Sequence, residues 1–383
     1  CIRDRSATIV EGGDDFITLR STVEGSGSDN AQQTGVKSIE GAGEHPIDFW
    51  IDFKGTIAEN STPRCAIVRV RYHNYTCEHD IYVRQGYAPI TIDGNAESDK
   101  NPAWASYNVY RFDANNAPVY TKSPLEEGSL FRRGNRTAIL ASNNDRPGFT
   151  FGLGPSGSFD VLELGATTPS QKTWSQLAPS ADDVKSRFAS WSIAGDHERI
   201  ATIEDFYTLE STSIHSNIGK AYGVLYGDGA TETQKSVEVA FGYDHNEDPT
   251  NSKKGMRGCF VFNINNSHNI FFPIGKSGYG RRKGMTSNGE KVGALRYAQR
   301  TDYYNKDGTG NIQYVPLFYD LFERPGAIYQ CRNRLESTNN EVKKSSAFDI
   351  NYFTMGFEGF ENGASNNNNG SDSDACFIRT VKY

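Results

Sequence analysis

The chain has 383 residues, a length that predicts two or three domains. Its formal net charge is −7, which excludes the basic surface typical of nucleic-acid-binding proteins. Hydrophobic residues make up 36% of the chain, and no apolar run approaches the ~20 residues needed to cross a bilayer. With 20 Tyr, 22 Phe and 38 Gly but 3 Met, the composition favours a β-rich, loop-rich protein that works outside the cell.

The first 90 residues show the period-2 alternation of β-strands. Runs such as FITLRSTV, RCAIVRVRY and CEHDIYVRQG are separated by stretches rich in Gly, Ser and Asn. The clearest hairpin covers residues 66–85, with its turn at HNYT. It resembles the final hairpin of the BACON family, Bacteroidetes-associated immunoglobulin-like modules. We therefore expect residues 7–90 to form an all-β sandwich, and the resemblance implies that this sandwich is immunoglobulin-like.

A second unit is predicted over residues 101–383, after a linker at residues 87–100 that is rich in Asp, Asn, Ser and Pro. Its first strand is expected at WASYNVYRF, which begins at Trp104. Two helices are expected. In residues 173–191, Val184, Phe188 and Trp191 recur at helical spacing. In residues 200–213, Thr202 or the residue before it caps a helix whose first turn is acidic.

The last third of the chain alternates short aromatic or β-branched runs with Gly-rich and Asn-rich breaks. The runs include RGCFVFN, NIFFPIG, RPGAIY, AFDINYF and the terminal ACFIRTVKY. We expect the terminal strand, residues 375–381, to lie inside a sheet, between or beside the strands at residues 258–262 and 347–353. A domain of this kind is closed by its own C-terminus.

These runs resemble the Fibrobacter succinogenes major paralogous domain, a C-type-lectin-like family, and more specifically the large surface and fimbrial-tip proteins of the Bacteroidales. The resemblance implies a C-type-lectin-like α+β domain over residues 101–383, and so an α+β chain overall. It also implies a non-catalytic adhesin at the bacterial cell surface, outer membrane or fimbrium. The implied partners are host or microbial glycans or proteins, and other fimbrial subunits. The chain departs from the family at Ala201, where the helix segment usually has proline.

The six cysteines show neither CxxC nor the Cys/His spacing of a zinc site. With a turn near residues 73–74, Cys77 falls opposite Val70 or Arg71, too far from Cys65 for a disulfide. Cys259 with Cys376 is the pair to test. Two interpretations of Cys1 remain open: the lipidated first residue of a mature lipoprotein, which would tether the chain to a membrane, or the edge of a truncated sequence.

No arrangement in the sequence is typical of a catalytic site. None of the seven histidines lies in a nucleophile or metalloprotease motif, and the acidic clusters lie in polar stretches. We therefore predict no enzymatic activity, no metal and no cofactor. Calcium stays open as an alternative, because residues 302–308 and 226–229 are rich in oxygen ligands, although the sugar-binding tripeptides of C-type lectins are absent.

A ligand-facing loop group is predicted at Tyr279, Arg281, Tyr303 and Tyr304, because carbohydrate sites combine aromatic rings with fixed polar groups. The alternative for these rings is that they complete a core with few Leu residues. Two other functions remain open besides the adhesin. One is a structural pilus or surface scaffold subunit without a ligand, and the other is an enzyme on the scaffold of the formylglycine-generating enzymes.

Overall fold

The computed structural model describes residues 4–13, 15–22, 32–41, 48–126, 128–132, 134–140, 149–150, 154–155, 158–173, 175–177, 193, 197–209, 217–226, 255–273, 281–283, 290–292, 304–306, 312–314, 326–332, 347–351, 355–357 and 375–383. Within these ranges the chain is mostly β-strand, arranged in several sheets. The α+β class expected for the chain is therefore not confirmed, because the described part holds little helix.

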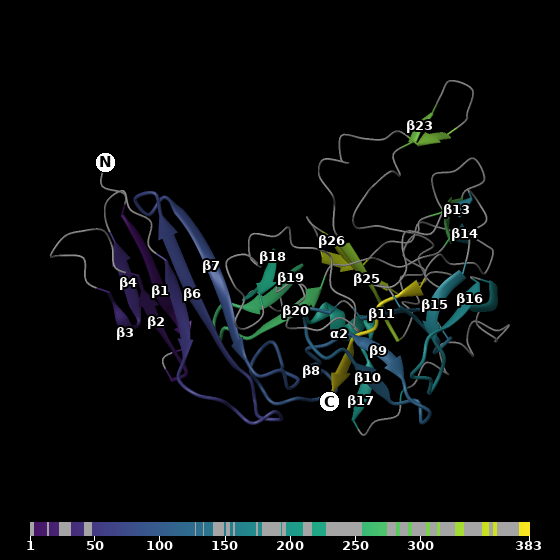
Figure 1. Cartoon of the computed structure of the whole chain (residues 1–383), viewed down its shortest axis with the longest axis horizontal. Helices are drawn as coiled ribbons and strands as arrows, with labels where there is room; N and C mark the ends of the chain where they lie inside the picture. Colours follow the sequence, from purple (N-terminus) through teal and green to yellow (C-terminus); the bar gives the residue numbers. More distant parts are fainter. Residues whose placement is uncertain are drawn as a thin grey trace.

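The N-terminal strands form two sheets that face each other. The strands are β1 (Arg5–Gly12), β2 (Ile17–Ser21), β3 (Thr34–Val36), β4 (Ser38–Gly41), β5 (Phe49–Phe53), β6 (Arg64–Tyr72) and β7 (Cys77–Gln85). One sheet has the order β4-β1-β6-β7 and the other the order β3-β2-β5. Side chains from both sheets, among them Leu19, Ile39 and Val68, share one apolar cluster. The expected all-β sandwich is thus confirmed for this part of the chain, at the left of Figure 1.

The β6–β7 hairpin pairs without a break from Arg64 opposite Gln85 to Tyr72 opposite Cys77. The predicted hairpin is confirmed, but the predicted partner of Cys77 is wrong by one or two residues. A longer turn causes the difference: His73, Asn74 and Tyr75 all have φ between 55° and 61°, a left-handed path that is strained for residues other than Gly. Cys65 and Cys77 lie at opposite ends of the hairpin and form no disulfide.

The rest of the chain contributes short antiparallel strands. They are β8 (Ala103–Trp104), β9 (Val109–Phe112), β10 (Pro118–Tyr120), β11 (Ser129–Arg132), β12 (Ala138–Leu140), β13 (Phe149–Thr150), β14 (Gly154–Pro155), β15 (Ser158–Leu162), β16 (Ser170–Thr173), β17 (Glu198–Ile200), β18 (Ile218–Tyr226), β19 (Gly255–Asn263), β20 (Asn269–Pro273), β21 (Arg281–Lys283), β22 (Glu290–Val292), β23 (Tyr304–Lys306), β24 (Ile312–Tyr314), β25 (Gly326–Gln330), β26 (Ala347–Asn351), β27 (Met355–Phe357), β28 (Ala375–Cys376) and β29 (Thr380–Lys382).

The C-terminal strand lies inside a sheet, as predicted. β29 is the middle strand of the order β17-β29-β8, so the last strand of the chain pairs with the strand that opens the second unit. The predicted neighbours at residues 258–262 and 347–353 are wrong: β19 pairs with β18 and β20, and β26 pairs with β25 and β27. Phe377, Ile378, Arg379 and Val381 are fully buried, which seats the terminus in the core.

The described helical segments are the 3-10 turn η1 (Ser175–Leu177) and the helix α2 (Ile203–Tyr207). α2 confirms the second predicted helix in shorter form. Thr202 is its N-cap, its side chain accepts the amide hydrogen of Asp205, and Asp205 reciprocates in a capping box. Residues 174 and 178–191 of the first predicted helix lie outside the described residues. Neither described helix has the length or apolar character needed to span a membrane.

Residues 87–100 do not behave as the predicted linker, because part of this segment is core. Ile90 exchanges backbone hydrogen bonds with Trp104, and both Ile90 and Ile92 are buried. They belong to the same apolar cluster as Trp104 and Cys65 of the sandwich. Figure 1 shows β18, β19 and β20 beside β7, and the ring of Tyr82 stacks on Phe260 at 5.6 Å between centroids. The sandwich and the second unit therefore share a packed joint.

Candidate functional site

Of the four residues predicted to face a ligand, the structure describes Arg281 and Tyr304. Arg281 opens β21, which pairs with β22, and Tyr304 opens β23, which pairs with β24. These hairpins form separate two-stranded sheets, and Figure 1 shows β23 far from the sandwich. Tyr279 and Tyr303 lie outside the described residues. The convergence of these four residues on one ligand therefore stays a prediction.

The calcium alternative is equally untested, because most of residues 302–308 and 226–229 lie outside the described ranges. Among the residues that are described, no group of three or more His, Cys, Asp or Glu side chains is placed to hold a metal ion. Cys259 is a buried thiol, so the structure does not form the bridge to Cys376. Burial raises the pKa of the Cys259 thiol to about 12, which keeps it protonated at neutral pH.

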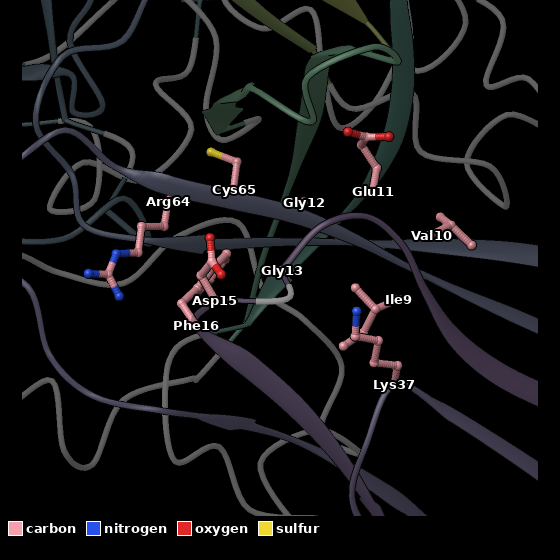
Figure 2. Close-up of a pocket in the computed structure, with 10 residues that line it drawn as sticks. All are labelled: Ile9, Val10, Glu11, Gly12, Gly13, Asp15, Phe16, Lys37, Arg64 and Cys65. Carbon is pink, nitrogen blue, oxygen red and sulfur yellow. The ribbon is translucent and has the colours of Figure 1, made fainter.

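A cavity of about 690 Å³ opens at the end of the sandwich that faces the second unit. A bulge in β1 between Ile9 and Glu11 lies in its wall. The chain then turns through Gly12, where a Cβ would lie 2.2 Å from the carbonyl oxygen of Cys65. Figure 2 shows the charged ends of Glu11, Arg64 and Lys37 pointing in different directions. Side chains that diverge in this way do not form an acid–base pair around one reacting atom.

A second cavity, of about 430 Å³, lies at the start of α2. Its central group is Arg199, which donates to the carboxylate of Asp205 at 2.7 and 3.1 Å and also to Asp99. The same guanidinium lies 4.3 Å from the ring centroid of Tyr383. This network connects β17, the first turn of α2 and the C-terminus. We interpret it as a structural tie, since the guanidinium is already held by two carboxylates.

The outer face of the smaller sheet carries an aromatic and charged arrangement that has no role in the core. Trp50 on β5 stands opposite Arg20 on β2, and its side chain is on the solvent side with 41% of the residue exposed. Arg20 places its guanidinium carbon 4.3 Å from the centre of the Trp50 ring. It also donates from Nε and Nη2 to the two carboxylate oxygens of Asp52, at 2.9 and 3.2 Å. We name these three residues the Trp50 platform.

Two contacts orient the side chains of the Trp50 platform. A bidentate pair fixes the plane of the guanidinium, and the guanidinium in turn fixes the ring beneath it by a cation–π contact. The platform combines a flat apolar face with a carboxylate and N–H donors at its edge, a combination that can stack on a sugar and read its hydroxyls.

The sequence contained half of the signal for this site. In FWIDF, period-2 alternation places Trp50 and Asp52 on one face while Phe49 and Ile51 pack against the core. The other half required the pairing of β5 with β2, which brings Arg20 next to Trp50 and could not be read from either strand alone.

Comparison with known proteins gives no relative for this chain. No protein-family model matches the sequence, no curated protein is significantly similar to it, and no solved structure matches it.

Proposed function

We propose that this protein is a non-catalytic adhesin of a bacterial cell surface or fimbrial tip, and that it binds glycans. The observation that carries the proposal is the Trp50 platform, an exposed tryptophan stacked against an ion-paired arginine on the outer face of a sheet. An isolated exposed aromatic residue is common on protein surfaces. A ring held on one side by Arg20, with a carboxylate beside it, is preorganised for a ligand.

The architecture supports the finer parts of the proposal. The two facing sheets fit an immunoglobulin-like, BACON-like N-terminal module. In the second unit, the pairing of β8 with β29 joins the first strand to the last, which fits a C-type-lectin-like domain closed by its terminus. Extracellular localisation is part of the same proposal, and it rests on the resemblance of the C-terminal segments to surface proteins.

A scaffold subunit is the second candidate, and the packed joint between the units favours it. Arg84 at the end of β7 donates to the carbonyl oxygens of Ala88 and Asn269 and to the hydroxyl of Ser106. A sandwich held firmly against the second unit suits a rigid spacer as well as an adhesin. The two candidates differ in whether the chain itself has a ligand.

A glycan array of the purified chain, run with and without EDTA, separates them. We expect binding to a defined group of glycans that persists in EDTA. Binding to no glycan would overturn the adhesin proposal and leave the scaffold. Loss of binding in EDTA would show that calcium takes part. A panel of glycoside and ester substrates run in parallel tests the non-catalytic part, which turnover abolished by one His or carboxylate substitution would contradict.

A further inference from the structure

Arg20 covers one face of the Trp50 ring, so a ligand that stacks on this ring would do so on the other face. The guanidinium carbon lies 4.3 Å from the ring centre, and yet Trp50 remains 41% exposed. A single face of one indole matches the size of one sugar ring, whose axial C–H groups form a flat apolar surface. The geometry is that of a stacking site rather than a groove.

Polar groups that can read hydroxyls lie directly beside this face. Asp52 accepts two hydrogen bonds from Arg20, so each carboxylate oxygen keeps further acceptor capacity. The side chain of Asp52 is 41% exposed and that of Arg20 is 32% exposed, so a ligand on the ring can reach both. Adjacent hydroxyl groups on one edge of a sugar would donate to the carboxylate and accept from the guanidinium.

The charge balance of the platform selects against acidic ligands. Arg20 and Asp52 are the charged residues of strands β2, β3 and β5, and they neutralise each other. Thr34 of β3 pairs with Arg20, and Thr18 of β2 pairs with Asp52. Both threonines are uncharged. A sugar carboxylate placed against Asp52 would meet a like charge, and the nearest cation, Arg20, is already engaged by Asp52.

We infer that the Trp50 platform binds the apolar face of a neutral pyranose that carries at least two adjacent hydroxyls on one edge. This inference rests on the proposed function and adds to it the site and the chemical class of the ligand. It also assigns the roles: Trp50 stacks, Asp52 accepts from hydroxyls, and Arg20 holds the other two in place.

The test is a titration of the intact chain with two matched sugars, methyl glucopyranoside and methyl glucopyranosiduronate, which differ by the carboxylate. We expect the neutral sugar to bind at least about tenfold more tightly, a ratio that corresponds to about 1.4 kcal/mol. Equal affinity, or tighter binding of the acidic sugar, would overturn the assigned ligand class.

Three variants locate the site. Trp50→Ala weakens neutral-sugar binding by about tenfold or more, the effect of losing a central aromatic contact, and Trp50→Phe weakens it less. Tyr75→Ala, which removes an equally exposed ring from the tip of the other sheet, leaves binding unchanged. Asp52→Asn removes the carboxylate that neutralises Arg20, so the ratio of the two affinities should fall towards one or favour the acidic sugar.

The outcomes keep the two proposals apart. Glycan binding on the array that survives Trp50→Ala and Trp50→Phe refutes this site while the adhesin proposal stands. Absence of glycan binding by the parent chain refutes the adhesin proposal itself. A selectivity between the two sugars that Asp52→Asn does not change would show that the ion pair plays no part in recognition.

Discussion

Arg84 shows how much one side chain can connect. It donates to the carbonyl oxygens of Gly86 and Ala88 in the segment after β7. It also donates to Asn269 at the start of β20 and to Ser106 after β8, at 2.7 Å each. Burial lowers the pKa of Arg84, although a guanidinium stays charged at neutral pH. A single residue thus ties the end of the sandwich to the second unit.

Replacing Arg84 therefore destabilises the protein. Arg84→Met leaves several acceptors in the joint without their donor, and we expect a loss of about 2 kcal/mol in the free energy of unfolding. Arg71→Met is the matched control, because Arg71 lies on the previous strand in an exposed pair with Glu78, where the loss is at most about 1 kcal/mol. Denaturant titrations measure both. Equal effects of the two substitutions would mean that Arg84 contributes no more than a surface residue.

Glu198 makes stability depend on pH at the edge of the terminal sheet. Its carboxylate accepts from Thr380 at 2.9 Å and from the hydroxyl of Tyr120. Burial raises its pKa above the ordinary 4.5, so the folded state holds the proton more tightly than the unfolded state does. The contribution of Glu198 to the free energy of unfolding is therefore most favourable below pH 4.5, and it declines as the pH rises towards the raised folded-state pKa.

The comparison with Glu198→Gln isolates this effect. Groups shared by both proteins cancel, so the stability of the parent relative to the variant should fall as the pH rises above 4.5. Chemical denaturation at intervals of half a pH unit measures the difference. A parent that gains stability over the variant as pH rises would contradict the assigned direction.

At the scale of elements, the terminal strand carries the clearest energetic claim. Val381 in β29 is fully buried between β17 and β8, whereas its neighbour Lys382 is exposed. Val381→Asp places a carboxylate in the core and should cost more than about 3 kcal/mol, a large fraction of the stability of a typical domain. Lys382→Ser, one residue away on the opposite face, should cost less than about 0.5 kcal/mol.

Thermal melting of the two variants tests this claim. A Val381→Asp variant that melts close to the parent would show that the terminal segment is a frayed tail, as chain ends often are.

Local elements could be predicted from the sequence, and their partners could not. The β6–β7 hairpin follows from alternation over residues 66–85, and α2 follows from Thr202 with Asp205 three residues later. The burial of the terminal strand follows from its apolar run. Its pairing with β17 and β8 could not be predicted, since these strands come from distant parts of the chain and nothing in the sequence of one indicates that it pairs with another. The Trp50 platform could not be predicted for the same reason, because it depends on the pairing of β2 with β5.

At the scale of the whole molecule, the joint couples two units whose boundaries, residues 7–90 and 101–383, stay a prediction. Ser267 donates to the carbonyl oxygen of Cys65 at 2.8 Å, and a ring nitrogen of His268 lies 2.7 Å from the carbonyl oxygen of Thr91. Tyr82 adds ring contacts with Phe260 and Phe262, and burial raises its pKa. Tyr82 of the sandwich thus packs against one face of the β18–β19–β20 sheet.

Expressing residues 101–383 alone tests both the boundary and the joint. We expect a soluble product that melts cooperatively but at a lower temperature than the intact chain, because it lacks Arg84 and Tyr82 of the joint and the buried Ile90 and Ile92. The intact chain with Arg84→Met should show part of the same decrease. An aggregated product would contradict the boundary, and an unchanged melting temperature would contradict a stabilising joint.

The central claim is that a glycan binds on the face of Trp50 opposite Arg20. The most direct measurement is a nitrogen-15 NMR spectrum of the indole N–H groups of the intact chain, with the Trp50 signal assigned from Trp50→Phe. Adding the best glycan from the array should shift the Trp50 signal and leave that of Trp104 in place, because Trp104 is fully buried. A glycan that binds at saturating concentration while the Trp50 signal stays unmoved would contradict the account.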